Sequence, residues 1–286
     1  MSTPVQETDS EETNLDDVRA VGDAYPDHEL ADELSTYKVP PGFGLIKSNI
    51  GLIITPVIIL LGGLALYSYV QSSDLIFQDE RALDWNGNLK PQLEQHLSIA
   101  IWSTVFTIVM AVPLGILLTR PRYKRAGSPI LAVATSAQAI PAFGLLVLAF
   151  AWLGRGPWTT IWALSLFTLL PVLRNTMVGL EQVDRSVIEA GRGMGLTKRQ
   201  ALRQIELPLA VPVILAGVRT ALVITVGMAA LAYLIGGGGL GETIGAGLSL
   251  SRDVVLITGA VMTALLALAV DWIAALIEKT LRPSGL

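Results

Sequence analysis

Apolar residues along the chain gather into six long runs, and short polar stretches separate them. A helix needs about 20 apolar residues to cross the hydrocarbon core of a bilayer. The run lengths therefore predict six membrane-spanning helices, of which the fourth is short and begins at Pro157. We place the six spans at residues 50–70, 97–119, 130–153, 157–173, 209–235 and 254–277.

The composition agrees with an all-α polytopic membrane protein. Of 286 residues, 52% are hydrophobic and 15% are charged, whereas a soluble domain carries about 25% charged residues. Cysteine is absent, which excludes a disulfide framework, a thiol nucleophile and a Cys-ligated metal. The two histidines, His28 and His96, both fall in polar stretches, so a His-rich metal site is also excluded.

Basic residues near the ends of the spans predict the orientation, because cytoplasmic loops carry an excess of Lys and Arg. One set of loops and the C-terminal end hold twelve such residues, and the opposite set holds four. Both termini are therefore expected in the cytoplasm. The larger set is Arg120, Arg122, Lys124, Arg125, Arg174, Arg185, Arg192, Lys198, Arg199, Arg203, Lys279 and Arg282, and the smaller set is Arg81, Lys90, Arg155 and Arg252.

The chain divides into three regions by composition. Residues 1–36 are acidic and poor in large apolar side chains, which predicts a disordered cytoplasmic tail and not a signal peptide. The tail is either a solvated segment without a specific task or one that tunes activity with ionic strength through screening. Residues 37–94 form the first span and an outer loop, and residues 95–283 form a transmembrane domain with a cytoplasmic segment at 184–207.

The cytoplasmic segment at 184–207 is polar and contains several residues that typically begin or end helices. Ser186 and Glu189 have the spacing of a capping box, and Asp184 is an alternative cap for the same helix. The helix is expected to run to about Met194, where Gly195 can adopt the left-handed conformation that ends it.

A second helix is expected directly afterwards. Thr197 and Gln200 repeat the capping-box spacing, and Pro208 lies where a further helix can begin, in its first turn. The segment is therefore predicted to be two short helices joined by a sharp glycine elbow, ahead of the fifth span. Such an elbow suits docking into a partner's groove, and an ordinary structured loop is the alternative.

The stretches "EAGRGMG" and "IELP" in this segment resemble the EAA loop of ABC-importer permeases. That pattern is Glu-Ala-Ala, three residues, Gly, nine residues and Ile-x-Leu-Pro, and the single departure is Gly191 in place of the second Ala. The resemblance implies that the segment is the coupling helix that sits in a cleft of a cytosolic ATPase subunit. The coupling residues are then Asp184, Arg185, Ser186, Glu189, Ala190, Gly191, Gly195, Leu196, Thr197, Ile205, Leu207 and Pro208.

Further stretches within about residues 95–250 resemble the permeases of quaternary-amine importers, among them "QAIPAFGLLVLA", "PVLRNTMVGLEQVD" and "LIGGGGLGETI". The resemblance implies the type I importer permease fold and uptake of glycine betaine, choline, carnitine or proline. It implies three kinds of protein partner: cytosolic ATPase subunits, a second permease chain that is identical or related, and an extracytoplasmic binding protein. It points to a bacterial or archaeal inner membrane and gives no nucleic-acid partner. The alternatives are the same machine for another small zwitterion or amino acid, an ATPase-independent secondary transporter, and a membrane enzyme or scaffold.

The chain has no Gly-Lys-Ser or Gly-Lys-Thr, so it has no phosphate-binding loop. We expect a transporter subunit and not an enzyme, without a cofactor or metal of its own, and with ATP and Mg²⁺ held by the ATPase chain. The glycine-rich stretch Gly236 to Thr243 lacks Lys and is interpreted as a flexible or re-entrant turn.

Charges inside spans are candidates for the translocation path. Arg219 lies about 15 Å into the fifth span, and we hypothesise that it pairs with Asp271, which could instead snorkel to the interface. Pro141, Gly227 and Met228 are further path candidates.

Trp152, Trp158 and Trp162 cluster around the turn between the third and fourth spans. They form either an aromatic belt at the membrane interface or a transient cation–π contact for a quaternary ammonium group.

Overall fold

The structure is a computed structural model, and the residues that it describes are 43–281. The predicted acidic tail at 1–36 lies outside this range. Within it, every regular element is helical, as the hydrophobic pattern predicts. The elements are α3 (Phe43–Ser72), α4 (Phe77–Ala82), η1 (Trp85–Leu89), α5 (Lys90–Leu118), α6 (Lys124–Gln138), α7 (Ala142–Leu153), α8 (Pro157–Phe167), α9 (Leu169–Glu181), α10 (Arg185–Gly193), α11 (Lys198–Ala201), η2 (Leu202–Glu206), α12 (Leu207–Ala229), η3 (Ala232–Ile235), α13 (Gly241–Leu250) and α14 (Asp253–Leu281).

Five helical runs in the described part of the chain are long and apolar enough to cross a membrane. They contain most of the first, second, fourth, fifth and sixth predicted spans, and the fourth is longer than predicted because α9 carries it on to Glu181. The fifth ends earlier than predicted, at Ala229, where the chain turns into η3. The five runs are Gly51–Ser72, Trp85–Leu118, Pro157–Glu181, Lys198–Ala229 and Asp253–Thr280.

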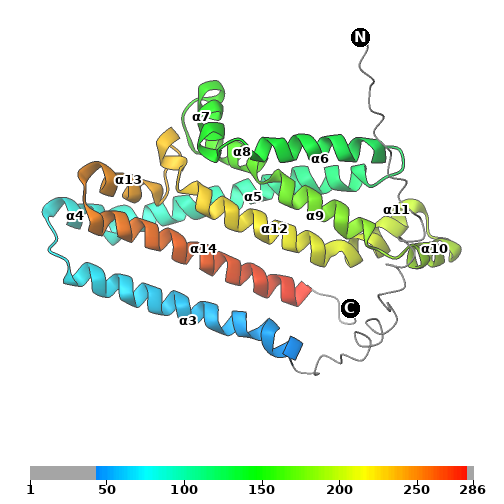
Figure 1. Cartoon of the computed structure of the whole chain (residues 1–286), viewed down its shortest axis with the longest axis horizontal. Coiled ribbons are helices and arrows are strands. Elements are labelled where there is room, and N and C mark those ends of the chain that lie inside the picture. The colour runs from blue at the N-terminus through cyan, green and yellow to red at the C-terminus, as the bar shows by residue number, and fades with distance from the viewer. Residues whose placement is uncertain (1–42, 282–286) are drawn as a thin grey trace, which may run out of the picture. The chain divides into compact units, whose positions relative to one another are not determined.

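The third predicted span, 130–153, is wrong as a single helix. The structure breaks it into α6 and α7 around Pro141, which is the N-cap of α7 with a ψ of 133°. The proline ring disfavours helical geometry for the residue before it and cannot donate a backbone hydrogen bond. In Figure 1, α7 accordingly leaves the direction of α6 instead of continuing it.

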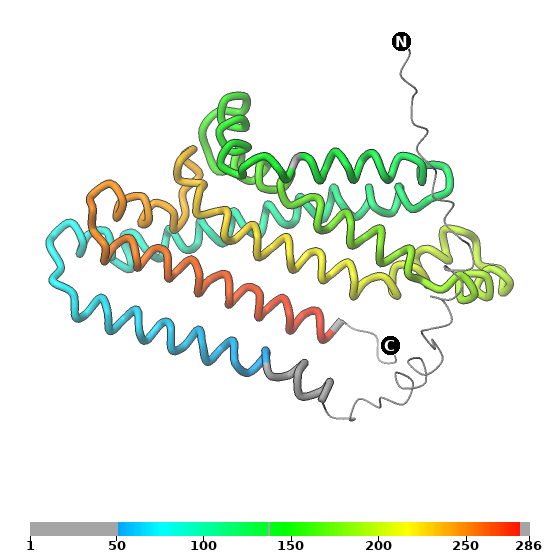
Figure 2. The backbone as a smooth tube through the Cα atoms, viewed as in Figure 1, coloured from blue at the N-terminus to red at the C-terminus, as the bar shows by residue number. Residues whose placement is uncertain are grey.

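Helices α5, α9, α12 and α14 pack side by side, with α12 between α9 and α14 (Figures 1 and 2). Small residues allow the close approach: the Cβ that Gly217 of α12 lacks would lie 2.9 Å from the Pro171 carbonyl of α9. The Cβ that Gly115 of α5 lacks would lie 2.7 Å from Thr176 of α9. Close contact through small residues is the usual way in which membrane helices associate.

The bundle has two ends with different elements. Elements α10 and α11 lie at one end, which we call the elbow end, and α13 and α4 lie at the other, which we call the glycine-loop end (Figure 1). The predicted coupling residues are at the elbow end, and the stretch Gly236 to Thr243 is at the glycine-loop end.

Candidate functional site

The predicted coupling segment, residues 184–207, begins with a capped helix. The Oδ1 atom of Asp184 accepts a hydrogen bond from the backbone N–H of Ser186 at 2.8 Å, and this bond lowers the pKa of the Asp184 carboxyl. Asp184 is therefore the cap, and the alternative Ser186–Glu189 capping box is wrong, because Ser186 already lies inside α10. The sequence allowed both because Asp184 and Ser186 are equally good cap residues.

The glycine elbow is present as predicted. Helix α10 ends at Gly193, and Gly195 has a φ of +95°, which side chains disfavour. The backbone N–H of Leu196 returns to the carbonyl of Gly191 at 3.2 Å. Gly191 is buried, and a Cβ there would meet the terminal methyl group of Ile205. The departure from the Glu-Ala-Ala pattern therefore lets the second helix lie close against the first.

The second capping box is confirmed, and a helix follows it as predicted. Thr197 N–H donates to Gln200 Oε1 at 2.9 Å, and Gln200 N–H donates to Thr197 Oγ1 at 3.3 Å. Helix α11 then runs through the π-helical turn η2 into α12 without a break, as one stretch of 32 residues. Pro208 lies in the first turn of α12, as predicted, and α12 follows directly on η2.

The outward surface of the elbow mixes charge and apolar area. Met194 is 81% exposed and Val187 is 44% exposed, and Glu189 and Ala190 are also exposed. Ile205, Leu196 and Leu207 are half-buried and form the inner side. A rigid projection with exposed Met and Val beside charged groups is suited to a complementary protein groove.

A partly buried ion pair fastens the C-terminal end of the segment to the end of α5. Arg120, just after α5, donates from Nη2 to Glu206 Oε2 at 2.6 Å and from Nη1 to Oε1 at 3.3 Å. Glu206 is only 7% exposed. A polar pocket of about 520 Å³ lies beside the pair and is bordered by Ile188 and Glu189 of α10. This pair was not predicted from the sequence, although a Glu within the apolar "IELP" was a signal that it needed a partner.

A second ionic cluster lies inside the membrane-spanning part. Arg219 donates from Nε and Nη2 to the two carboxylate oxygens of Asp271, at 2.6 and 2.7 Å, so the hypothesised pair is confirmed. Glu278, which was not predicted from the sequence, lies 3.5 Å from Arg219 Nη1. The three border an open pocket of about 460 Å³ with Thr220 and Val223.

The other path candidates fall in different places. Gly227 is exposed, with open space where a Cβ would be, and it follows Thr220 and Val223 at helical spacing along α12. Met228 packs partly buried against a core cluster of α5, α7 and α8 that includes Ile99 and Leu146. Pro141 lies apart from these residues, at the break before α7.

At the glycine-loop end, His96 is fully buried, although the sequence around it is polar. Its Nε2 lies 2.8 Å from the Val226 carbonyl, and its Nδ1 accepts from the Leu240 N–H at 3.3 Å. Gln95 Oε1 accepts from the Gly239 N–H at 3.1 Å. These bonds to α5 favour the re-entrant interpretation of the loop over a flexible one, and they bring together residues at least 130 positions apart in the chain.

Comparison with known proteins gives the family. The profile of the "Binding-protein-dependent transport system inner membrane component" family matches residues 111–283. The chain belongs to this family. It is thus the permease subunit of an ABC importer, an integral membrane protein and a transporter.

Characterised relatives align with this permease over nearly their whole length. It is 38% identical over 200 residues to the "Choline transport system permease protein OpuBB" of Bacillus subtilis, which is 70% of this chain and 91% of that one. It is 39% identical over 209 residues to the "Osmoprotectant import permease protein OsmW" of Salmonella typhimurium, 71% and 96% of the two chains. A solved structure of the MetNI methionine ABC transporter, inward facing, aligns with a TM-score of 0.60 at 24% identity over 68% of this chain and 95% of that one, and it supports the fold alone.

An ion pair between Arg252 and Asp79 fastens helix α4 at the glycine-loop end of the permease. Arg252 Nε donates to Asp79 Oδ1 at 2.9 Å, and the Ile76 N–H donates to Asp79 Oδ2 at 3.2 Å. The bond from Arg252 holds the pKa of the fully buried Asp79 carboxyl below its ordinary value. Helix α4 is thereby fixed to the turn between α13 and α14.

Of the three tryptophans near the turn between the third and fourth predicted spans, Trp158 and Trp162 lie against Phe106 of α5. Trp162 stacks on Phe106 with ring centroids 4.9 Å apart, and Trp158 meets it edge-on at 6.5 Å. Trp102 also lies beside Phe106, at 6.2 Å, whereas Trp152 on α7 is 89% exposed. One face of Trp162 is thus already covered, and both the belt and the cation-contact interpretations stay predictions.

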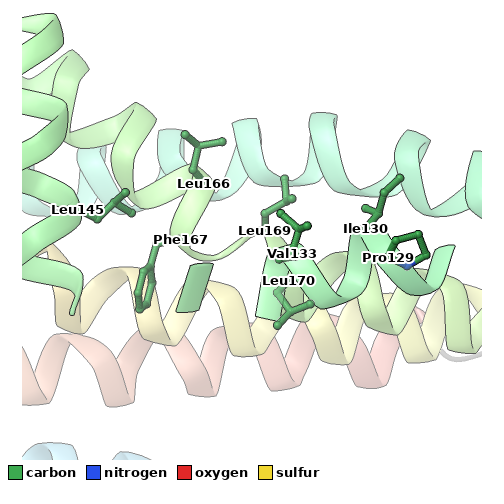
Figure 3. Close-up of a pocket in the computed structure, with 9 residues that line it drawn as sticks. Pro129, Ile130, Val133, Leu145, Leu166, Phe167, Leu169 and Leu170 are labelled. Carbon is green, nitrogen blue, oxygen red and sulfur yellow. The ribbon is translucent and has the colours of Figure 1, made fainter. Parts of the chain in front are cut away.

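An apolar groove of about 500 Å³ lies between α6, α7, α8 and α9 of the permease. Figure 3 shows Ile130 and Val133 on one side and Leu145 and Phe167 on the other. The residues that line the groove have no polar side chain to offer a charged solute, so it is a poor candidate for the path.

Proposed function

We propose that this permease imports quaternary-amine compatible solutes, with glycine betaine, choline and carnitine as the substrate class. The observation that carries the proposal is the 38% identity to a choline-transport permease across 91% of that protein's length. A second relative at 38% identity is named a glycine betaine/carnitine/choline permease. A permease for another small zwitterion or amino acid remains the alternative that the experiment must exclude.

The elbow is proposed to be the part that receives mechanical work from the ATPase. A cytosolic ATPase subunit would bind the exposed face that includes Glu189, Ala190 and Met194, with the elbow end in the cytoplasm of a bacterial or archaeal cell. ATP and Mg²⁺ would stay on that subunit. The short helix is capped at Asp184 and packed through Gly191 on Ile205, so a push on its surface moves the segment as one body.

The open face of α12 is proposed to line the translocation path, opposite a second permease chain. Arg219 lies about 18 Å along the helix from Leu207, and it forms the ionic cluster with Asp271 and Glu278. Charged groups at such depth face protein or water, because exposure to lipid is costly. Thr220 and Gly227 share this face, which favours an aqueous path over a lipid boundary. An extracytoplasmic binding protein would deliver the solute at the glycine-loop end.

The proposal is tested by reconstituting the permease in nanodiscs with its co-expressed ATPase and binding protein. Wild type, Glu189→Lys and the matched control Glu94→Lys, an exposed Glu at the opposite end of the bundle, are compared. We expect the ATPase to co-purify with wild type and the control and to be lost in Glu189→Lys. Glycine betaine, choline or carnitine should stimulate ATP hydrolysis, and methionine should not. Stimulation by an amino acid alone would overturn the substrate class, and failure of any ATPase to co-purify would overturn the ATPase-coupled mechanism.

A further inference from the structure

Helices α5 and α12 are fastened to each other near both ends. At the elbow end, Arg120 follows the C-cap of α5 and Glu206 immediately precedes the first residue of α12, and the two side chains form a two-pronged ion pair. Arg120 also donates from Nε to the Ile116 carbonyl at 3.2 Å. The guanidinium is therefore oriented by α5 before it meets Glu206.

Near the glycine-loop end, His96 of α5 makes the corresponding link. Its Nε2 bonds to the carbonyl of Val226 in α12, and its Nδ1 accepts from the backbone of Leu240. The bond to Leu240 requires Nδ1 to be unprotonated, so Nε2 is the donor to Val226. Thr243 Oγ1 donates to Gln92 Oε1, one helical turn away on α5. The loop thus moves with α5 and not only with α12.

Helix α5 is able to carry displacement between the two links. It belongs to a continuous helical run of 34 residues, Trp85–Leu118. Ala100 of α5 and Val226 of α12 are both fully buried in one cluster. Thr107 Oγ1 bonds to the Ser165 carbonyl at 3.0 Å, and Ser165 Oγ bonds to the Ser103 carbonyl at 3.0 Å, so α8 is locked to α5 as well.

The ion pair at the elbow end is a costly way to obtain stability. Taking the Glu206 carboxylate and part of the Arg120 guanidinium out of water offsets much of their attraction, and apolar pairs of similar volume are often at least as stable. What the pair supplies is direction, because two parallel N–H···O bonds fix the angle between guanidinium and carboxylate. The neighbouring pocket of about 520 Å³ leaves space between α10 and the end of α5. The pair is therefore placed to carry force to α5, beside the apolar cluster that contains Leu207 and Ile116.

We propose that the Arg120–Glu206 pair is the strut through which displacement of the coupling segment reaches α5. With the strut in place, α5 and α12 move as one unit and carry the glycine loop with them. Arg120 and Glu206 are positioning residues for the transport cycle and contact neither solute nor ATP. The inference rests on the proposed function, since it needs an ATPase that acts on the elbow.

Two variants separate transmission from stability. Glu206→Gln keeps the shape and removes the charge, and the double variant Arg120→Met/Glu206→Leu replaces the pair by apolar side chains. The matched control is Glu181→Gln, which breaks the exposed Lys124–Glu181 pair at 3.9 Å near the same end. Each is reconstituted with the ATPase and binding protein, and solute uptake and ATP hydrolysis are measured on the same vesicles.

We expect the ATPase to remain bound in all variants, because the exposed face of the elbow is unchanged. The number of solute molecules imported per ATP should fall about tenfold in both strut variants, within the range seen when coupled positions are altered. The control should match wild type. The double variant is decisive, since it should stay as stable as wild type and still be uncoupled.

A stable double variant with the wild-type ratio of solute to ATP would overturn the strut. A loss of thermal stability or yield in Glu206→Gln, with the ratio unchanged in the protein that remains, would reduce the pair to a structural contact and also overturn it. Failure of the proposed function looks different, because wild type itself would then bind no ATPase. If wild type imports only other solutes, the ratio is measured with those and the strut is judged on the same criteria.

Discussion

The two ends of the bundle are held together in opposite ways. At the glycine-loop end, side chains bond to segments far away in the chain, as His96 does to Val226 and Arg252 does to Asp79. At the elbow end, Asp184 bonds two residues on and Thr197 bonds three residues on. The long-range ionic contact of the coupling segment is the pair of Glu206 with Arg120.

This difference has a mechanical meaning. A segment that is fastened internally keeps its shape when a partner moves it, whereas a loop fastened to several helices shifts only when those helices shift. Coupling between distant sites requires packed elements that both sites can bias. On the proposed function, the elbow would receive the displacement from the ATPase, and the glycine-loop end would follow the helices that deliver it.

Of the variants that test this contrast, His96→Ala is expected to lower the free energy of unfolding most. The change leaves the Val226 carbonyl and the Leu240 N–H without partners and opens a cavity in a fully buried position. Two unsatisfied buried groups and a cavity cost about 3 to 5 kcal/mol. The free energy of unfolding in mixed micelles measures the loss.

Gln95→Ala is the matched control, because it removes one bond to Gly239 from an exposed residue. Its cost should be about 1 kcal/mol. Equal losses for the two variants would mean that the buried imidazole does not organise the glycine-loop end.

A smaller, pH-dependent loss of stability is expected when the Asp79–Arg252 ion pair at the glycine-loop end is removed. Asp79→Asn removes the carboxylate that pairs with Arg252, and the loss is limited because Arg252 keeps part of its side chain in water. The hydrogen bond from Arg252 lowers the pKa of Asp79 in the folded protein, below about 3.9 in the unfolded chain. The carboxylate therefore stabilises the fold above about pH 4, and this contribution is lost as the pH falls through the folded-state pKa.

Thermal unfolding of wild type and Asp79→Asn at stepped pH measures this contribution. The difference between the two should be constant from about pH 7 to 5 and should shrink below about pH 4. A difference that persists unchanged into acid would assign the effect to packing of the carboxamide and not to the ion pair.

Much of the structure of the elbow end could be predicted from the sequence, because it depends on residues a few positions apart. Features that depend on contacts between distant segments could not. Thr197 and Gly195 act on residues within a few positions, so their roles are visible in the sequence, whereas Asp184 could not be separated from Ser186 because both are good cap residues. The break at Pro141 was not predicted, because the apolar run continues across it and a proline inside a membrane helix can also give only a kink. His96 and Val226 come together only in the folded bundle, so no local sequence pattern predicts their contact. Arg219 with Asp271 was foreseeable because two opposite charges in apolar runs require each other.

The smallest expected effect is at the elbow, where Gly193 and Gly195 lie two positions apart. Gly195 has a φ of +95° with nothing within 4 Å of the place that a methyl group would take, and Gly193 ends α10 with equally open space and no positive φ. Gly195→Ala should therefore cost about 1 kcal/mol through backbone strain alone, and Gly193→Ala should stabilise the helix by up to about 1 kcal/mol. Hydrogen exchange of the α10 amides measures both. Because the steric surroundings of the two positions are alike, opposite signs isolate the backbone turn, and equal signs would show that the elbow does not depend on a left-handed residue at Gly195.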